Sequence, residues 1–383
     1  MNYIYNSLEK LQKYVETNEY KGYDPYDALK SPLFKIPILK SSKKIRFIGQ
    51  QLGKRSPLNL RPILFVPKGL NPVTLGLSLQ AYAYQLQGNL DKTDILEQKI
   101  NSLIDQLIEL IPKGFSGACW GYDFDWEARY AKIDGYQPTV VGTSIVVNAL
   151  YEYYKVSKSQ RAKDLILSAS NFVINDLNKT VVDDTICFSY SPFDHQQVFN
   201  ASMKGVRILS QAYSLSPNNL ILEKAKMGAK YIYESQNEDG SWFYSRAKVG
   251  GWIDNYHTGY ILDSLDDFIT LTGDTTFLEN LNMGVKYYIN NFFEPDGFPK
   301  FYNNNKFPID CTAASQSILT LVRFNYIDEA EKVANFMVEN MQSKKGYFYF
   351  RKFKFYTIKT PFMRWSQAWM FSAFSYLLSR TTK

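Results

Sequence analysis

An internal repeat constrains the fold of this chain more than any other feature of its sequence. Each copy opens with a short aromatic stretch, continues with a polar loop, and ends in a helix rich in Ala, Ser, Leu and Ile. Five copies are visible, beginning at residues 117, 185, 240, 297 and 346. The matching positions Gln137, His195, His257, Thr312 and Gln367 lie 55 to 62 residues apart. A period of this length predicts supersecondary units that stack on one another.

Helices with one charged face separate the copies. We expect them over Gln160–Leu177, Asn219–Glu234, Thr276–Phe292 and Ile327–Met341. The helices inside the copies lack a strictly polar face, which is typical of helices covered on most sides. This alternation predicts the inner and outer helices of an α/α toroid.

Two further hairpins complete the ring. Asn71–Gln87 and Lys92–Ile111 form one, and Tyr3–Thr17 closes the other against Arg364–Ser379. We therefore predict an all-α (α/α)6 toroid, a six-hairpin barrel, as a single domain over 1–383, with short β-turn strands at one rim. Residues 19–68 are Pro-rich, and we expect them to cross one end as an irregular but ordered segment.

Charge and motif content exclude several classes of function. The net charge of +7 includes two basic patches, Lys40–Arg46 and Lys344–Lys359, which are either a solvated face or a surface that attracts an acidic polysaccharide. No nucleic-acid motif, nucleotide-binding loop or metal-ligand spacing is present, so we expect no nucleic acid, cofactor or metal.

Neither a membrane span nor a signal peptide is expected, because the apolar runs are short and the N-terminus lacks the signal pattern. Three cysteines without paired spacing favour a reducing compartment, and we predict a cytoplasmic protein. The oligomeric state is left open.

The loops before the inner helices should converge on one end of a toroid. They carry aromatic, acidic and basic side chains together, a combination that suits a sugar: aromatic rings stack on its C–H faces and polar groups bind its hydroxyls. The individual aspartates are equally suitable as helix N-caps, and Tyr256 and Tyr260 as core residues. The expected rim residues are Trp120, Asp123, Asp125, Asp194, His195, Asp254, Tyr256, His257, Tyr260, Asp310, Arg364, Trp365 and Gln367.

Two stretches resemble the unsaturated glucuronyl hydrolases, which are (α/α)6 enzymes. WIDNYHTGYILDSLDDFITLTGD (252–274) is similar to their I-D-N motif, and RWSQAWMFSAFSYLL (364–378) to their R-G-Q-A-W helix start, with Trp365 and Ser366 in place of the glycine. The resemblance implies that Asp254 is the catalytic acid/base. Asp125 and Asp194 are candidates for the second catalytic aspartate of that family.

Other resemblances point to related chemistry. The Tyr256–His257 pair at a helix start is similar to glucuronyl C5-epimerases, and Asn255, Tyr256 and His257 together to toroidal polysaccharide lyases. The D-x-T-A-A-x-Q and M-R-W-x-Q-A-W-M motifs resemble uncharacterised toroid proteins associated with bacterial surface-polysaccharide synthesis. QNEDGSW (236–242) resembles a structural motif of terpene cyclases, whose D-x-D-D acid is absent.

The first hypothesis is a carbohydrate-active enzyme acting on an acidic, uronic-acid-containing glycan by hydrolysis, elimination or epimerisation. Asp254 would be the acid/base, Asp125 or Asp310 a second carboxylate, and Arg364 the partner of the substrate carboxylate. His257 and Tyr260 would transfer protons in elimination or epimerisation. The remaining rim residues, including stacking Trp120 and Trp365, would bind substrate. The alternatives are a non-catalytic glycan-binding protein and an isoprenoid-handling toroid.

Overall fold

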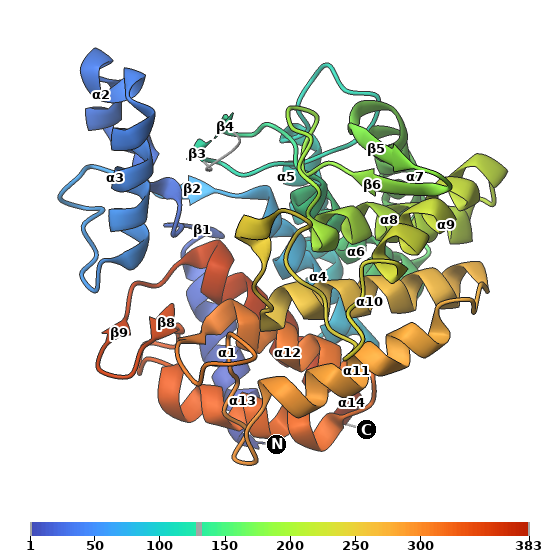
Figure 1. Ribbon diagram of the computed structural model, residues 1–383. Helices are drawn as coiled ribbons and strands as arrows, with labels where there is room; N and C mark the ends of the chain where they lie inside the picture. Colours follow the sequence, from blue (N-terminus) through green and yellow to red (C-terminus); the bar gives the residue numbers. More distant parts are fainter. Residues whose placement is uncertain (1, 128–131, 382–383) are drawn as a thin grey trace.

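Six buried helices form a closed inner ring in the computed structural model, which describes residues 2–127 and 132–381 (Figure 1). Each contacts the next along the chain, and the last returns to contact the first. They are α4 (Pro72–Gly88), α6 (Val140–Ser157), α8 (Phe199–Leu215), α10 (Asn255–Thr272), α12 (Cys311–Arg323) and α14 (Trp369–Thr381). A π-helical turn, η5 (Met363–Ala368), leads into α14.

Six helices surround this ring, each packed on inner helices. They are α1 (Asn2–Thr17), α5 (Thr93–Glu109), α7 (Gln160–Asn171), α9 (Asn219–Tyr233), α11 (Leu278–Phe292) and α13 (Ile327–Met341). A π-helical turn, η3 (Phe172–Asp176), extends α7 to almost its predicted end. Helix α1 packs on α13 and α14 and so closes the ring. The predicted (α/α)6 toroid is confirmed.

Sequence explains which helices lie inside. Helix α4 buries every residue from Pro72 to Gln85, whereas α5 buries only a stripe that runs from Leu96 to Leu107. Small residues allow the inner helices to approach closely. A Cβ atom added at Gly76 of α4 would lie 3.1 Å from the Cα of Val146 in α6, so a larger residue there would push the two helices apart.

The strands are short, antiparallel and located mostly in the loops that lead into inner helices. The pairs are β1 (Lys21–Gly22) with β2 (Gly69–Leu70), β3 (Trp126–Glu127) with β4 (Lys132–Ile133), and β5 (Lys179–Val182) with β6 (Thr185–Phe188). The three-stranded sheet comprises β7 (Ile309–Asp310), β8 (Arg351–Lys352) and β9 (Thr357–Ile358). Asp310 is paired with Arg351 in register, which joins the loops before α12 and α14.

Residues 19–68 are more regular than predicted. They contain two 3-10 turns, η1 (Asp27–Lys30) and η2 (Pro32–Lys35), and two helices, α2 (Pro37–Ser41) and α3 (Lys43–Arg55). The expectation of an irregular segment was wrong for α3, whose N-cap Ser42 accepts a hydrogen bond from the amide of Ile45. The prolines on either side of α3 made the segment look irregular in the sequence, although the stretch between them forms a helix. In Figure 1, α2 and α3 stand out from the toroid.

None of the described helices is both long and apolar enough to cross a bilayer. The three cysteines, Cys119, Cys187 and Cys311, are buried and unpaired.

Candidate active site

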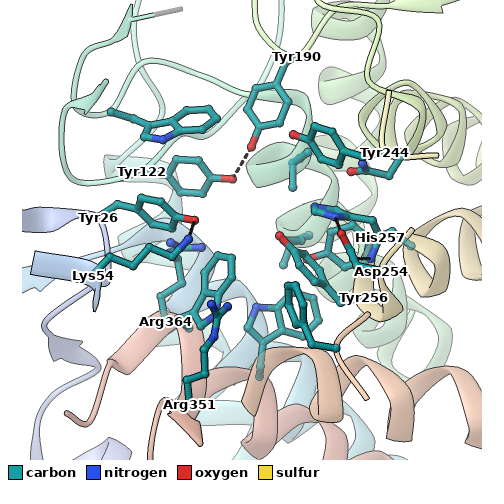
Figure 2. Close-up of a pocket in the computed structure, with 18 of the residues that line it drawn as sticks. Tyr26, Lys54, Tyr122, Tyr190, Tyr244, Asp254, Tyr256, His257, Arg351 and Arg364 are labelled. Carbon is teal, nitrogen blue, oxygen red and sulfur yellow. Dashed lines mark hydrogen bonds and ion pairs between the residues drawn. The ribbon is translucent and has the colours of Figure 1, made fainter. Parts of the chain in front are cut away.

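A cavity of about 260 Å³ opens where the inner helices begin (Figure 2). Most side chains that line it are aromatic, and the charged ones come from four separate segments of the chain. Its lining comprises Tyr26, Lys54, Tyr122, Phe124, Trp126, Val141, Ile145, Tyr190, Asn200, Tyr244, Trp252, Asp254, Tyr256, His257, Tyr260, Phe301, Tyr302, Arg351, Arg364, Trp365 and Trp369. Such a cavity has the size and character of a site for a small ligand or one end of a longer one.

Asp254 and His257 form a hydrogen-bonded dyad in the wall of the cavity. Asp254 is the N-cap of α10, and its Oδ1 accepts the amide hydrogen of His257 at 3.0 Å. Its Oδ2 lies 2.7 Å from His257 Nδ1 and also accepts the indole N–H of Trp252 at 2.9 Å. The carboxylate is buried, while the imidazole keeps 17% of its surface exposed. The same aspartate therefore caps the helix and orients the histidine.

This geometry determines which nitrogen of His257 can react. A carboxylate only accepts hydrogen bonds, so Nδ1 carries the hydrogen and Nε2 carries the free lone pair. Nε2 has no hydrogen-bond partner among the residues that the structure describes. A neutral imidazole oriented through Nδ1 and open at Nε2 is suited to act as a general base.

Tyrosines surround the imidazole. The ring centroids of Tyr244 and Tyr256 lie 4.7 and 3.8 Å from that of His257. Burial raises the pKa of both phenols, and also that of Tyr260 on the next turn of α10. These hydroxyls consequently remain protonated at neutral pH and can donate a proton or a hydrogen bond to a ligand.

Two arginines and a lysine supply the positive charges of the lining, and each arginine is paired with an aspartate. Arg364 donates from Nε and Nη2 to Asp24, at 2.6 and 2.9 Å, and Arg351 donates from the same two atoms to Asp310, at 2.8 and 2.5 Å. The carboxylate partners outweigh the cost of burial and raise the pKa of each guanidinium, so both stay charged. Figure 2 shows both arginines across the cavity from His257, with Lys54 beside Tyr26.

Asn200, at the start of α8, is the one buried amide in the lining. Its side chain is 2% exposed, and Nδ2 has no hydrogen-bond partner in the described part of the chain. A buried amide hydrogen without an acceptor is costly, and a ligand in the cavity would supply one.

Six of the thirteen predicted site residues come together here: Asp254, Tyr256, His257, Tyr260, Arg364 and Trp365. The other seven do not line this cavity, so the expectation of one shared cavity was wrong for them. The repeat fixes the end of the toroid at which a residue lies, but it does not fix the direction of its side chain.

Three of the four acids among those seven are buried and serve the backbone or an ion pair. Asp194 accepts hydrogen bonds from the amides of Tyr190 and Gln196 within its own turn. Asp123 accepts from Lys30 and Asn71, both at 2.7 Å. Asp310 caps α12 by accepting the amide hydrogens of Thr312 and Ala313, and it also accepts a hydrogen bond from Arg351. Each carboxylate is already occupied by protein donors.

Three further side chains lie outside the cavity, those of Asp125, Trp120 and Gln367. Asp125 is exposed and accepts the amide hydrogen of Gly135. Trp120 is fully buried and donates to the carbonyl oxygen of Leu107. Gln367 is fully buried and pairs with both backbone groups of Phe348.

His195 lies in an adjoining groove rather than in the cavity itself. This groove, of about 740 Å³, shares Trp126, Tyr244 and Trp252 with the cavity and also includes Arg246. Both histidines therefore lie at the same end of the toroid. The groove gives a ligand larger than the cavity room to continue past Trp252.

Sequence reasoning missed several lining residues. Tyr26 and Lys54 come from the segment expected to be irregular, and Arg351 comes from β8, inside the basic patch Lys344–Lys359. Asn200 had a usable signal, because it occupies the first turn of a repeat helix that is otherwise apolar and small. The described residues contain no cluster of three or more His, Cys, Asp or Glu side chains that could hold a metal ion.

Comparison with known proteins identifies the fold. No family model and no curated protein matches the sequence. Among solved structures, cellobiose 2-epimerase from Bacillus thermoamylovorans aligns over 100% of both chains with 12% identity and a TM-score of 0.63. A family 76 glycoside hydrolase, a mannosidase from Bacteroides thetaiotaomicron, aligns over 99% of this chain and 100% of its own, with 10% identity and a TM-score of 0.60.

An unsaturated glucuronyl hydrolase specific for heparin aligns over 83% of this chain and 89% of its own, with 13% identity and a TM-score of 0.59. The chain is thus similar in fold to six-hairpin toroid enzymes, as its motifs predicted. At these identities the likeness establishes the architecture only.

Proposed function

We propose that this protein is a carbohydrate-active enzyme that transfers protons on a uronic-acid residue of an acidic glycan, by epimerisation or β-elimination. The observation that carries the proposal is the Asp254–His257 dyad, whose free Nε2 belongs to a residue lining the cavity. An oriented neutral imidazole in such a place is suited to remove a proton from carbon.

A sugar fits the rest of the lining. Tryptophan and tyrosine rings, among them Trp252, Trp365 and Trp369, offer flat faces for the C–H surfaces of a pyranose. Asn200 and the tyrosine hydroxyls supply hydrogen-bonding groups. The fold likeness to enzymes named for sugar substrates supports the same class of ligand.

An acidic substrate fits the charge of the cavity. Arg351, Arg364 and Lys54 line it, whereas Asp254 is the one carboxylate in the lining among the described residues. Each arginine uses Nε and Nη2 for its own aspartate, and Nη1 has no partner in the described chain. These atoms can bind the carboxylate of a uronic acid.

The proposed chemistry starts at the carbon next to the substrate carboxyl group. His257 Nε2 takes the proton, and the C–H electron pair moves into the carboxyl group, where the cationic side chains stabilise the added negative charge. In epimerisation, a tyrosine hydroxyl returns a proton to the opposite face of that carbon. In elimination, the bond to the β-oxygen breaks, a C=C bond forms, and a tyrosine hydroxyl gives its proton to the leaving oxygen. Exchange with water then restores His257 and the tyrosine.

Hydrolysis by two carboxylates has less support. That mechanism places two acids roughly 5–9.5 Å apart across the substrate. The predicted second acids, Asp125, Asp194 and Asp310, lie outside the lining, and Asp310 is held by Arg351. Non-catalytic glycan binding remains the alternative. A role in bacterial surface-polysaccharide metabolism and a cytoplasmic location remain predictions of the sequence.

Reaction in D2O distinguishes these functions. The protein is incubated with oligosaccharides of glucuronic, mannuronic and galacturonic acid, with a neutral oligosaccharide as control, and the products are examined by NMR and mass spectrometry. Deuterium at the carbon next to the carboxyl group indicates epimerisation, and a new C=C bond indicates elimination. New reducing ends with neither change would replace the proposal by hydrolysis. Saturable binding without any product would leave a glycan-binding protein.

A further inference from the structure

The positive charge of this protein is concentrated in one segment, residues 28–68, which we call the arm. The arm contains ten Lys and Arg residues and no Asp or Glu. The remainder of the chain has 34 basic and 37 acidic residues, a net charge of −3. The excess that makes the whole chain basic therefore lies in the arm, which includes α2 and α3 and projects from the toroid in Figure 1.

Helix α3 presents apolar side chains on its outward face. Ile45, Ile48 and Leu52 are spaced by three and four residues and are exposed, Leu52 to 62%. This spacing places them in one stripe along the helix. The opposite face is fixed to the protein, because Gly53 packs against Ala28 and Gln50 donates to the carbonyl oxygen of Tyr26.

The apolar exposure extends beyond α3. Ile38 in α2 is 76% exposed, and Leu58, Ile63 and Phe65 in the following turns are exposed to between 71% and 75%. So many exposed aliphatic and aromatic side chains on one short segment are unusual for a protein surface that faces only water.

Several cations on the arm have no acidic partner among the described residues. Three are in ion pairs: Lys30 with Asp123, Arg46 with Glu127, and Arg61 with Asp27. Others are exposed and unpaired in that part of the structure, namely Lys35, Lys40, Lys44 and Arg55. Lys44 and Arg55 lie at the two ends of the apolar stripe of α3.

We propose that the arm is a membrane-surface anchor, with α3 lying in the interface of a bilayer that contains anionic lipids. Aliphatic side chains flanked by cations are what such an interface binds, since the former enter the acyl boundary and the latter contact lipid headgroups. A second copy of the same face fits poorly, because two arms without acids would repel each other. A nucleic acid would use the cations but not the aliphatic stripe.

The arm also contributes to the cavity. Lys54 of α3 donates to the hydroxyl of Tyr26, and both residues line the cavity. Docking through the outward face of α3 would therefore hold the cavity close to the membrane. The anchor itself does not depend on the chemistry proposed for the site.

Vesicle co-sedimentation of the full chain tests the proposal. Vesicles of phosphatidylcholine with phosphatidylglycerol are compared with vesicles of phosphatidylcholine alone. We expect binding to the anionic vesicles, reduced by added salt. The variant Lys35→Gln/Lys40→Gln/Lys44→Gln should bind the anionic vesicles roughly a hundredfold more weakly than the wild type. The variant Ile45→Ser/Ile48→Ser/Leu52→Ser should bind them at least about tenfold more weakly. The charge-matched control Lys92→Gln/Lys344→Gln/Lys345→Gln, outside the arm, should bind like the wild type.

A label at one position of the stripe reports insertion while Ile45 and Leu52 stay in place. Ile48→Cys carrying an environment-sensitive fluorophore should shift its emission to the blue on anionic vesicles, whereas the same label at Lys344→Cys should not. Equal binding of all variants, or no binding by the wild type, would refute the anchor. The anchor would also be refuted if analytical ultracentrifugation showed a wild-type dimer and a monomeric Ser variant, because a second copy would then cover the stripe.

Discussion

Two polar regions lie one behind the other in the toroid, and only one of them has the features of a site. The rim cavity and the axial cluster, formed by Arg207, Asp263, Asp267 and Arg323, both contain arginines and buried aspartates. In the axial cluster, Asp267 accepts from Arg207 at 2.5 Å and from Arg323 at 2.6 Å, and Asp263 accepts from Gln316 and Thr320. The space beside it is about 20 Å³, against about 260 Å³ at the rim.

The difference shows that buried charge alone does not identify an active site. The axial carboxylates are bound by protein donors around a space of the size of one water molecule. At the rim, His257 Nε2 and Asn200 Nδ2 have no partner in the described chain, and there is room for a ligand. Unused hydrogen-bonding capacity beside open space distinguishes the two regions.

The largest expected effect is on turnover at the rim. Asp254→Asn and His257→Ala should each lower the rate of the proposed reaction by about 10²–10⁴-fold, because one disturbs the orientation of the base and the other removes it. Asn still caps a helix, so Asp254→Asn should leave the melting temperature nearly unchanged. The measurement is the initial rate of deuterium incorporation or C=C formation. Full activity in both variants would remove the dyad from the mechanism.

The next effect is on stability at the axial cluster. Asp267→Ala should lower the free energy of unfolding by about 3–5 kcal/mol, since it leaves Arg207 and Arg323 buried without this carboxylate. Denaturant titration measures the loss, and turnover per folded molecule should be unaffected. A loss of turnover without a loss of stability would show that the axial cluster belongs to the site.

The pH dependence of this variant provides a second check. Burial alone would raise the pKa of Asp267, but Arg207 and Arg323 outweigh it and lower the pKa below its usual value. The contribution of Asp267 to stability is therefore present above the unfolded pKa and is lost as the pH falls through the folded pKa. Asp267→Ala should accordingly weaken the acid-induced loss of stability.

A smaller effect, on KM, is expected for one of two buried polar groups that have no hydrogen-bond partner in the part of the chain that the structure describes. Asn200 Nδ2 and Ser144 Oγ are both buried without a partner in the described residues, but only Asn200 lines the cavity. Asn200→Ala should raise the KM for the glycan up to about tenfold, the value of one hydrogen bond. Ser144→Ala is the matched control and should leave KM unchanged. An equal change in both variants would mean that Asn200 acts through packing.

The smallest effect concerns Lys204, which lies between the two regions. Its Nζ lies 3.8 Å from the centroid of the Tyr260 ring, in the lining of the axial space. Burial, and then the charge of Arg207, lower its pKa well below the usual value. The unfolded chain thus binds the proton more tightly, and stability rises with pH between the folded pKa and about 10.4.

Lys204→Met should remove that rise and add about 1 kcal/mol of stability at neutral pH. Thermal melts across pH measure both changes. A strong loss of stability would show instead that Lys204 is a needed cation of the axial cluster.

The sequence by itself determined the architecture. Matching positions 55 to 62 residues apart, with small-residue helices inside and half-charged helices outside, allow few arrangements besides a toroid, because each hairpin buries its apolar face only against its neighbours. The same pattern located Asp254 and His257 at the start of an inner helix, at the end where the cavity lies.

Only the tertiary structure decided which rim residues face the cavity. A repeat position fixes the end of the barrel, whereas the direction of a side chain depends on what the local turn must satisfy. Asp194 and Asp310 meet backbone amides, while Asp254 meets one amide and also the imidazole of His257. Tyr26 and Lys54 could not be assigned from the repeat, because the segment that carries them has no counterpart in it. Packing between segments that are far apart in the chain brings them to the rim. Such contacts leave no local pattern in a single sequence.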